Sequence, residues 1–410
     1  MTATSRSADI KARLWQEVAL KAELITDGVA ITPEALELAA PGVRAQEQVH
    51  NLFEMDFATH DFELPSGFDL PHGLSVPFRW NARSAHVIAA DGNRTVLLRD
   101  GHELAEVAFH PRPGFYGRTT SDGQEMGNVA ALYRKRALFV AYSNECSYKD
   151  RGEDCAFCNI NHTKDYYGEK DGIFWKTPQQ IGEVAAAALA EGAIDHITIS
   201  GGVIPERREL EYYLDVAEAI QSHTGLDDFN GTAVVAAPLD LRHIDRFREA
   251  GYRTTAMNIE IWDKGFYDTI CPGKARAGGG WDHWVNALKY ATRVFGHGRV
   301  RSNMVAGLEP KRKTLEGLEY LAAEGVVGTF TIWCPNPGSE LEGHRAPHAE
   351  WYLDLAEKTT AIWKKNGFTF QQVCDANASN DLLQHDIWRI QDELLPVFAE
   401  PAPALAVHAA

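Results

Sequence analysis

Residues 137–158 of the sequence are ALFVAYSNECSYKDRGEDCAFC, an apolar and aromatic run followed by a polar segment that holds three of the six cysteines. The run at 137–143 is typical of a buried strand. Cys146, Cys155 and Cys158 come directly after it, separated by eight and then by two residues. A two-residue gap lets neighbouring sulfurs share one soft metal centre. This stretch therefore predicts a strand with a metal-binding loop at its end.

The chain after residue 136 repeats an alternation of short strands and longer helices, which is typical of β-α units and a parallel sheet. We predict strands at 137–143, 196–200, 232–236, 254–261, 299–305 and 327–333, with 368–373 as a possible seventh. We predict helices at 178–191, 207–224, 241–250, 281–295, 313–324 and 348–366. These patterns favour an α/β fold with a full or partial β/α barrel. A doubly wound open sheet has the same local pattern and stays open as the alternative.

Glycines support this segmentation, because a residue just past a helix end often adopts the left-handed conformation that glycine adopts without strain. Each of the six predicted helices is followed by one: Gly192, Gly225, Gly251, Gly296, Gly325 and Gly367.

Residues 1–130 lack this alternation, and we expect them to form an N-terminal α+β region. The segment 85–108 alternates like a small hairpin with Asp91-Gly92 at its turn. The barrel and a C-terminal extension then cover 131–398. Residues 399–410 are rich in Ala and Pro, and we expect a flexible tail there.

The composition is that of an ordinary globular protein, with 45% hydrophobic and 24% charged residues among 410. The net charge of −17 comes from 40 Lys and Arg against 57 Asp and Glu, and such a surface repels nucleic acids. The sequence shows no apolar leader at its start and no spanning run of about 18 apolar residues. We therefore expect a cytoplasmic protein with neither nucleic acid nor membrane as a partner.

The three clustered cysteines leave two metal sites open on spacing alone. A cubane iron–sulfur cluster held by three thiolates would keep one iron free for a substrate or cofactor. Zinc would instead take Cys146, Cys155, Cys158 and His162 as a closed set of four ligands, which would make a structural site in a non-radical α/β protein.

The motifs beyond this loop resemble those of the radical S-adenosylmethionine (radical SAM) superfamily, over about residues 136–335. Phe157 is the aromatic residue before the third cysteine, and ITISGG ends the second predicted strand. The eight-residue first gap departs from the usual three, so the cluster loop is divergent, and Val203 stands where the commonest form has an acid. The cofactor contacts that the resemblance implies are Phe157, Gly201, Gly202, Glu260, Ser302, Asn303 and Gly307.

The resemblance implies a partial (β/α)6 TIM-type barrel and an enzyme. A [4Fe–4S] cluster on Cys146, Cys155 and Cys158 would bind S-adenosylmethionine (SAM) at its fourth iron. Reductive cleavage of SAM would then start radical chemistry on a small-molecule metabolite, usually through a 5′-deoxyadenosyl radical that abstracts hydrogen. Radical transfer of an aminocarboxypropyl or methyl group from SAM is the alternative. An external electron donor such as flavodoxin or ferredoxin is implied as a partner.

Three further cysteines are candidate catalytic residues. If the barrel prediction holds, Cys271, Cys334 and Cys374 all follow strands and lie at the face where β/α barrels carry their active sites. At least one of them is expected to face the substrate as a thiol donor, a radical partner or a ligand of an auxiliary cluster.

Overall fold

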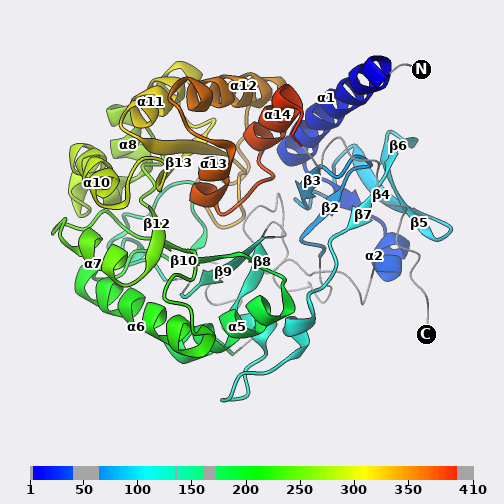
Figure 1. The fold of residues 1–410 in the computed structure, drawn as a ribbon. Coiled ribbons are helices and arrows are strands. Elements are labelled where there is room, and N and C mark those ends of the chain that lie inside the picture. Colours follow the sequence, from blue (N-terminus) through cyan, green and yellow to red (C-terminus); the bar gives the residue numbers. More distant parts are fainter. Residues whose placement is uncertain (1–2, 40–63, 134–135, 144, 161–171, 395–410) are drawn as a thin grey trace.

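The computed structural model describes residues 3–39, 64–133, 136–143, 145–160 and 172–394. Its centre is a seven-stranded sheet in the order β14-β13-β12-β11-β10-β9-β8, which curls into an open half-barrel with helices on its outer face (Figure 1). From β9 to β14 the strands are neighbours in the order in which they follow along the chain. A doubly wound sheet would reverse that order, so the partial β/α barrel is confirmed.

The barrel strands agree closely with those expected from the sequence, although β8 was not predicted. Their bounds are β8 Ala131–Tyr133, β9 Ala137–Ala141, β10 His196–Ser200, β11 Gly231–Val234, β12 Tyr252–Ala256, β13 Val300–Ala306 and β14 Val326–Ile332. Every neighbouring pair is parallel except β8 and β9, which are antiparallel. The carboxyl ends of β9 to β14 therefore meet at one end of the half-barrel, as β/α enzymes require.

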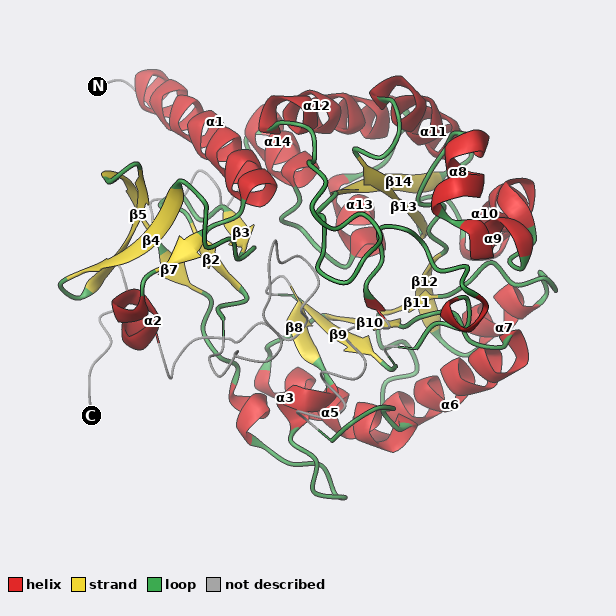
Figure 2. Ribbon diagram, turned by 180° about the vertical axis from the view of Figure 1, so that it is seen from behind, coloured by secondary structure: helices red, strands yellow, loops and turns green. Residues whose placement is uncertain are grey.

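The six predicted helices are also present, on the outer face of the sheet (Figure 2). They are α5 Pro178–Glu191, α6 Glu206–Thr224, α7 His243–Glu249, α10 Gly280–Phe295, α11 Lys311–Ala323 and α12 Ala349–Lys365. The first begins where Thr177 and Gln180 form a capping box, and it ends at Gly192 in the left-handed region. Two short helices between β12 and α10 were not predicted, α8 Lys264–Ile270 and α9 Pro272–Arg276.

The seventh strand predicted at 368–373 is wrong, because the chain there forms helix α13, Phe370–Asn377, followed by α14, Leu383–Asp392. Thr369 and Gln372 make a reciprocal capping box that starts the helix in spite of the aromatic residues around them. Helix α13 lies at the amino ends of the strands. Its Asp375 pairs with Arg136, which directly precedes β9, at 2.5 Å.

The N-terminal region is mixed α and β. Its elements are α1 Ala3–Asp27, β1 Ala30–Ile31, α2 Pro33–Ala39, β2 Gly67–Asp69, β3 Ser75–Pro77, β4 His86–Asp91, β5 Arg94–Arg99, β6 His102–Glu106, β7 Ala108–Phe109, η1 Gly114–Gly117 and α3 Met126–Val129. Strands β4 and β5 form the predicted hairpin around Gly92, whose φ is 60°. The domain boundaries stay a prediction, and the predicted tail at 399–410 lies outside the described residues.

The N-terminal region packs against the open side of the half-barrel (Figures 1 and 2). Helix α1 packs on α12 and α14, where Lys21 and Asp386 form a fully buried ion pair at 2.6 Å. Arg79 joins the two parts, because its guanidinium donates to the carbonyl oxygens of Ile25 and Ile332, both at 2.9 Å. None of the helices that the structure describes combines the length and hydrophobicity needed to cross a bilayer.

Candidate functional site

The cysteine loop leaves the carboxyl end of β9 and is held by backbone hydrogen bonds to two other segments. The N–H of Ser147 donates to the carbonyl oxygen of Val203 at 2.8 Å, and the N–H of Ala156 donates to that of Ile270 at 2.9 Å. A single 3-10 turn, η2 Lys149–Arg151, lies between the first two cysteines. The long first gap is therefore ordered chain, packed between the loops that follow β10 and β12.

The three thiols of this loop lie in one electrostatic environment. Burial raises the pKa of Cys146 and, to about 12, that of Cys158, and the neighbouring Cys155 thiol raises both further. A hydrogen bond with Cys271, followed by burial, raises the pKa of Cys155. Across the described part of the chain, no three His, Cys, Asp or Glu side chains stand close enough to hold a metal ion. The alternative zinc ligand His162 lies outside the described residues.

Gly201 and Gly202 bring the end of β10 directly against the cysteine loop. A Cβ atom added to Gly202 would lie 1.8 Å from the carbonyl oxygen of Glu145 and 2.9 Å from the Cβ of Cys146. A Cβ atom on Gly201 would lie 2.4 Å from the Tyr142 ring. Only glycine permits this approach, and the donor set beside it consists of soft thiols. The chemistry of these donors therefore fits an iron–sulfur cluster, although the three thiols would have to draw closer together to hold one.

Glu260 lies beyond the end of β12, not within it, so the prediction of a strand up to residue 261 is wrong at its end. Its backbone has a φ of 65°, which is rare for a residue other than glycine. Two hydrogen bonds to β13 hold it there, from the Glu260 N–H to the Asn303 oxygen at 2.9 Å and from the Val305 N–H to the Glu260 oxygen at 2.8 Å. Such an enforced conformation is typical of functional positions.

Lys274, which the sequence analysis did not assign, is the partner of Glu260. It comes from the unpredicted helix α9, and its Nζ donates to Glu260 Oε1 at 2.9 Å and to the Asn258 oxygen at 2.7 Å. Burial lowers the pKa of Lys274, but Glu260 and the thiols of Cys155 and Cys271 outweigh burial and raise it. A buried ammonium group therefore lies beside the Glu260 carboxylate and interacts electrostatically with the Cys155 and Cys271 thiols.

The other predicted cofactor contacts, Ser302, Asn303, Gly307 and Phe157, each make a contact within the protein. Ser302 is buried and accepts a hydrogen bond from the Ile259 N–H at 3.0 Å, so it supports the segment before Glu260. Asn303 Oδ1 accepts from Thr331 Oγ1 at 3.0 Å and faces a cavity. Gly307 has a φ of 111°, and a Cβ there would lie 2.5 Å from the Tyr352 hydroxyl. Phe157 packs against the core.

The three further cysteines do not come together. All are buried, and Cys271 adjoins Cys155 whereas Cys334 follows β14. Cys374 lies in helix α13 at the amino ends of the strands, so its predicted place at the carboxyl ends is wrong. The cause is the capping box that makes this segment a helix.

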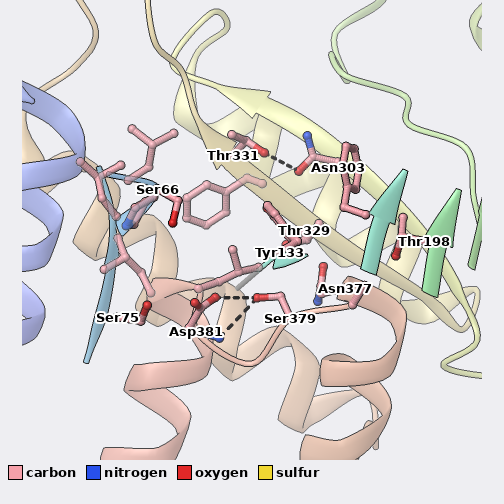
Figure 3. A pocket seen from close by; sticks show the side chains of 18 of the residues that line it. Ser66, Ser75, Tyr133, Thr198, Asn303, Thr329, Thr331, Asn377, Ser379 and Asp381 are labelled. Carbon is pink, nitrogen blue, oxygen red and sulfur yellow. Dashed lines mark hydrogen bonds between the residues drawn. The ribbon is translucent and has the colours of Figure 1, made fainter. Parts of the chain in front are cut away.

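A cavity of about 440 Å³ lies inside the half-barrel. Its walls come from the sheet, from the N-terminal region and from the connection between α13 and α14. Figure 3 shows Thr198, Asn303 and Thr329 on three of the strands, with Ser66 and Ser75 from the N-terminal region. Ser200, the residue before Gly201, and Asn258, which binds Lys274, also line it, so the cavity adjoins the glycine pair and the Lys274–Glu260 pair. Its volume falls in the range of small-molecule sites.

The family model described as the radical SAM superfamily matches residues 142–322, which include the cysteine loop, the glycine pair and the Lys274–Glu260 pair. Residues 142–322 therefore form a radical SAM domain. This radical SAM protein is therefore an enzyme of a superfamily that uses a [4Fe–4S] cluster and SAM, as the resemblance implied.

Several known proteins are similar to this radical SAM enzyme. A bacteriochlorophyllide c C-7(1)-hydroxylase of Chlorobaculum limnaeum is 25% identical over 292 residues, 68% of this chain and 72% of that protein. Among solved structures, a radical SAM methyltransferase from Sphaerobacter thermophilus has a TM-score of 0.42 at 15% identity, covering 67% of this chain and 71% of that one. The coproporphyrinogen III oxidase of Escherichia coli has a TM-score of 0.37 at 14% identity, covering 60% and 56%.

Proposed function

We propose that this enzyme holds a [4Fe–4S] cluster on Cys146, Cys155 and Cys158 and abstracts a hydrogen atom from a small molecule bound in the half-barrel cavity. When bound, the cluster and SAM supply the reductive C–S cleavage that gives a 5′-deoxyadenosyl radical. The observation that carries the proposal is the approach of Gly202 to the cysteine loop, where a Cβ would meet Glu145 at 1.8 Å.

The chain's own residues would position SAM and the substrate next to each other. Gly201 and Gly202 leave room beside the thiols for the methionine end of SAM. The Lys274–Glu260 pair is preorganised, since both side chains are nearly buried and Glu260 is fixed by β13. Asn258, which accepts from Lys274, connects this pair to the cavity, so a substrate there lies next to the cofactor site.

Hydrogen abstraction is the reaction type that we propose. The similar hydroxylase from Chlorobaculum limnaeum favours a reaction at a C–H bond, which agrees with hydrogen abstraction. Transfer of an aminocarboxypropyl or methyl group remains the second candidate. We also propose an external electron donor of the flavodoxin or ferredoxin kind, and a cytoplasmic location as expected from the sequence.

The test is anaerobic reconstitution followed by iron analysis and chromatography of the SAM products after reduction with dithionite. We expect about four irons per chain and 5′-deoxyadenosine. Cys155→Ala should lose the iron, whereas the matched Cys374→Ala should keep it, because Cys374 lies in α13 at the opposite end of the strands. Methylthioadenosine would instead indicate aminocarboxypropyl transfer, and S-adenosylhomocysteine would indicate methylation. A single zinc per chain, lost in His162→Ala, would contradict the proposal.

A further inference from the structure

Arg301 places a guanidinium group in the cavity wall without an acidic partner. It is the second residue of β13, and its Nε is buried without a hydrogen-bond partner. No ion pair joins its guanidinium to an acidic side chain of the described residues, and the nearby carboxylate of Glu260 is already paired with Lys274. Burial lowers the pKa of Arg301, and Tyr133 and Glu260 offset this only in part.

Two hydroxyl groups in the same cavity also have unused hydrogen-bonding capacity. Thr198 on β10 is 3% exposed and Thr329 on β14 is 2% exposed, and the Oγ1 atoms of both are buried with no hydrogen-bond partner (Figure 3). Buried polar groups are nearly always paired, because an unpaired one keeps its full desolvation cost. A cation and two hydroxyls left unsatisfied around one space indicate that a polar ligand group belongs there.

The other cationic side chains of the cavity wall are engaged within the protein. Arg79 uses both terminal nitrogens to bind the carbonyl oxygens of Ile25 and Ile332. The His110 ring contacts Ser75 at 2.9 Å and Asp69 at 3.2 Å. Arg301 is therefore the cavity cation that remains available among the described residues.

We infer that the substrate of this enzyme carries a carboxylate and that Arg301 binds that carboxylate inside the half-barrel. The inference rests on the proposed function, which makes the cavity the substrate site. A planar guanidinium matches a carboxylate with two parallel hydrogen bonds. One available cation suits a monoanion better than a phosphate dianion, and Phe78, Phe139 and Phe330 provide an apolar wall for the organic remainder.

The test is fluorescence anisotropy of the reconstituted enzyme with SAM, using 1-pyrenebutyrate and its methyl ester as probes. These probes share the pyrene and its chain, but the ester has a methyl group in place of the carboxylate charge, and the protein's net charge of −17 works against any general attraction of the acid. We expect the acid to bind at least about tenfold more tightly than the ester, as a charge-assisted pair provides. Arg301→Gln should abolish that preference. Arg299→Gln, an exposed arginine two residues earlier and outside the cavity wall, should keep it.

Equal affinity for acid and ester, no binding of the acid, or a preference that survives Arg301→Gln would each overturn the inference. The comparison of the two probes on the unaltered enzyme decides the matter even if the Arg301 variant does not fold. Failure of the proposed function would appear differently, as unaltered protein that lacks the cluster and forms no 5′-deoxyadenosine. An enzyme that cleaves SAM but binds acid and ester equally refutes the carboxylate alone.

Discussion

Gly202→Ala should disrupt the cluster site while leaving the barrel folded. The new methyl group would start 1.8 Å from the Glu145 oxygen and 2.9 Å from the Cys146 Cβ. An ordinary contact between such atoms is about 3.5 Å, so the cysteine loop has to shift by roughly 1.7 Å or the β10 end has to move. The loop is the part that can yield, because β10 is paired with β9 and β11 on both sides. A displacement of that size moves Cys146 out of register with the other two thiols.

We expect iron bound after reconstitution to fall below half of the unaltered value in Gly202→Ala. SAM cleavage should fall about a hundredfold, a loss that a 1 Å misplacement of reacting groups can cause. The matched control is Gly117→Ala, since an added Cβ there meets nothing within 4 Å. Iron analysis, visible absorption and 5′-deoxyadenosine formation measure the outcome, and circular dichroism checks the fold. Full iron content with unchanged cleavage in Gly202→Ala would refute the claim that this glycine positions the loop.

Three further predictions concern buried charges. Lys274→Met should lower the free energy of unfolding by about 3 kcal/mol, because it leaves the carboxylate of Glu260 buried and unpaired; urea denaturation measures this, and adding Glu260→Gln should recover part of the loss. Burial raises the pKa of Glu209 from 4.5 to about 8, so its contribution is fully present below pH 4.5 and is lost as the pH rises towards 8. Glu209→Gln should therefore remove a pH-dependent loss of up to about 4 kcal/mol between pH 5 and pH 8, which the exposed Glu211→Gln on the same helix should retain. Lys21→Met should cost about 3 kcal/mol by leaving its buried carboxylate partner on α14 with one cation fewer, and an unchanged midpoint in thermal unfolding would contradict this.

The regular part of the barrel could be predicted from the sequence because its signals are local. A capping box with Pro178 marks the start of α5, and Gly192 marks its end. The same local signals failed at 368–373, where aromatic residues suggested a strand while Thr369 and Gln372 supplied the helix start. Short elements such as α8 and α9 bury too few residues to show a clear periodicity.

The sequence pointed to the cysteines and glycines, whose role as a cluster and cofactor site stays a prediction, but it did not point to the charged groups beside them. Lys274 and Glu260 are 14 residues apart and meet only because α9 folds back over the end of β12. Arg301 is a charged residue in a strand between buried neighbours, and such a residue needs a partner because burying an unpaired charge is costly. This was a signal for a functional position in the sequence itself. No spacing rule in one sequence joins Arg301 to Thr198 and Thr329, which lie on other strands.

The way Arg79 connects the two parts of the molecule has a consequence for how such enzymes diversify. The match to the radical SAM family covers residues 142–322, whereas Ser66, Ser75 and Phe78 of the cavity wall come from a separate stretch of chain that Arg79 ties to β14. Replacement of that stretch would change which substrate fits the cavity and would leave the cysteine loop unchanged. Changes within residues 64–79 would therefore reshape one wall of the cavity without altering the segment that carries the cysteine loop.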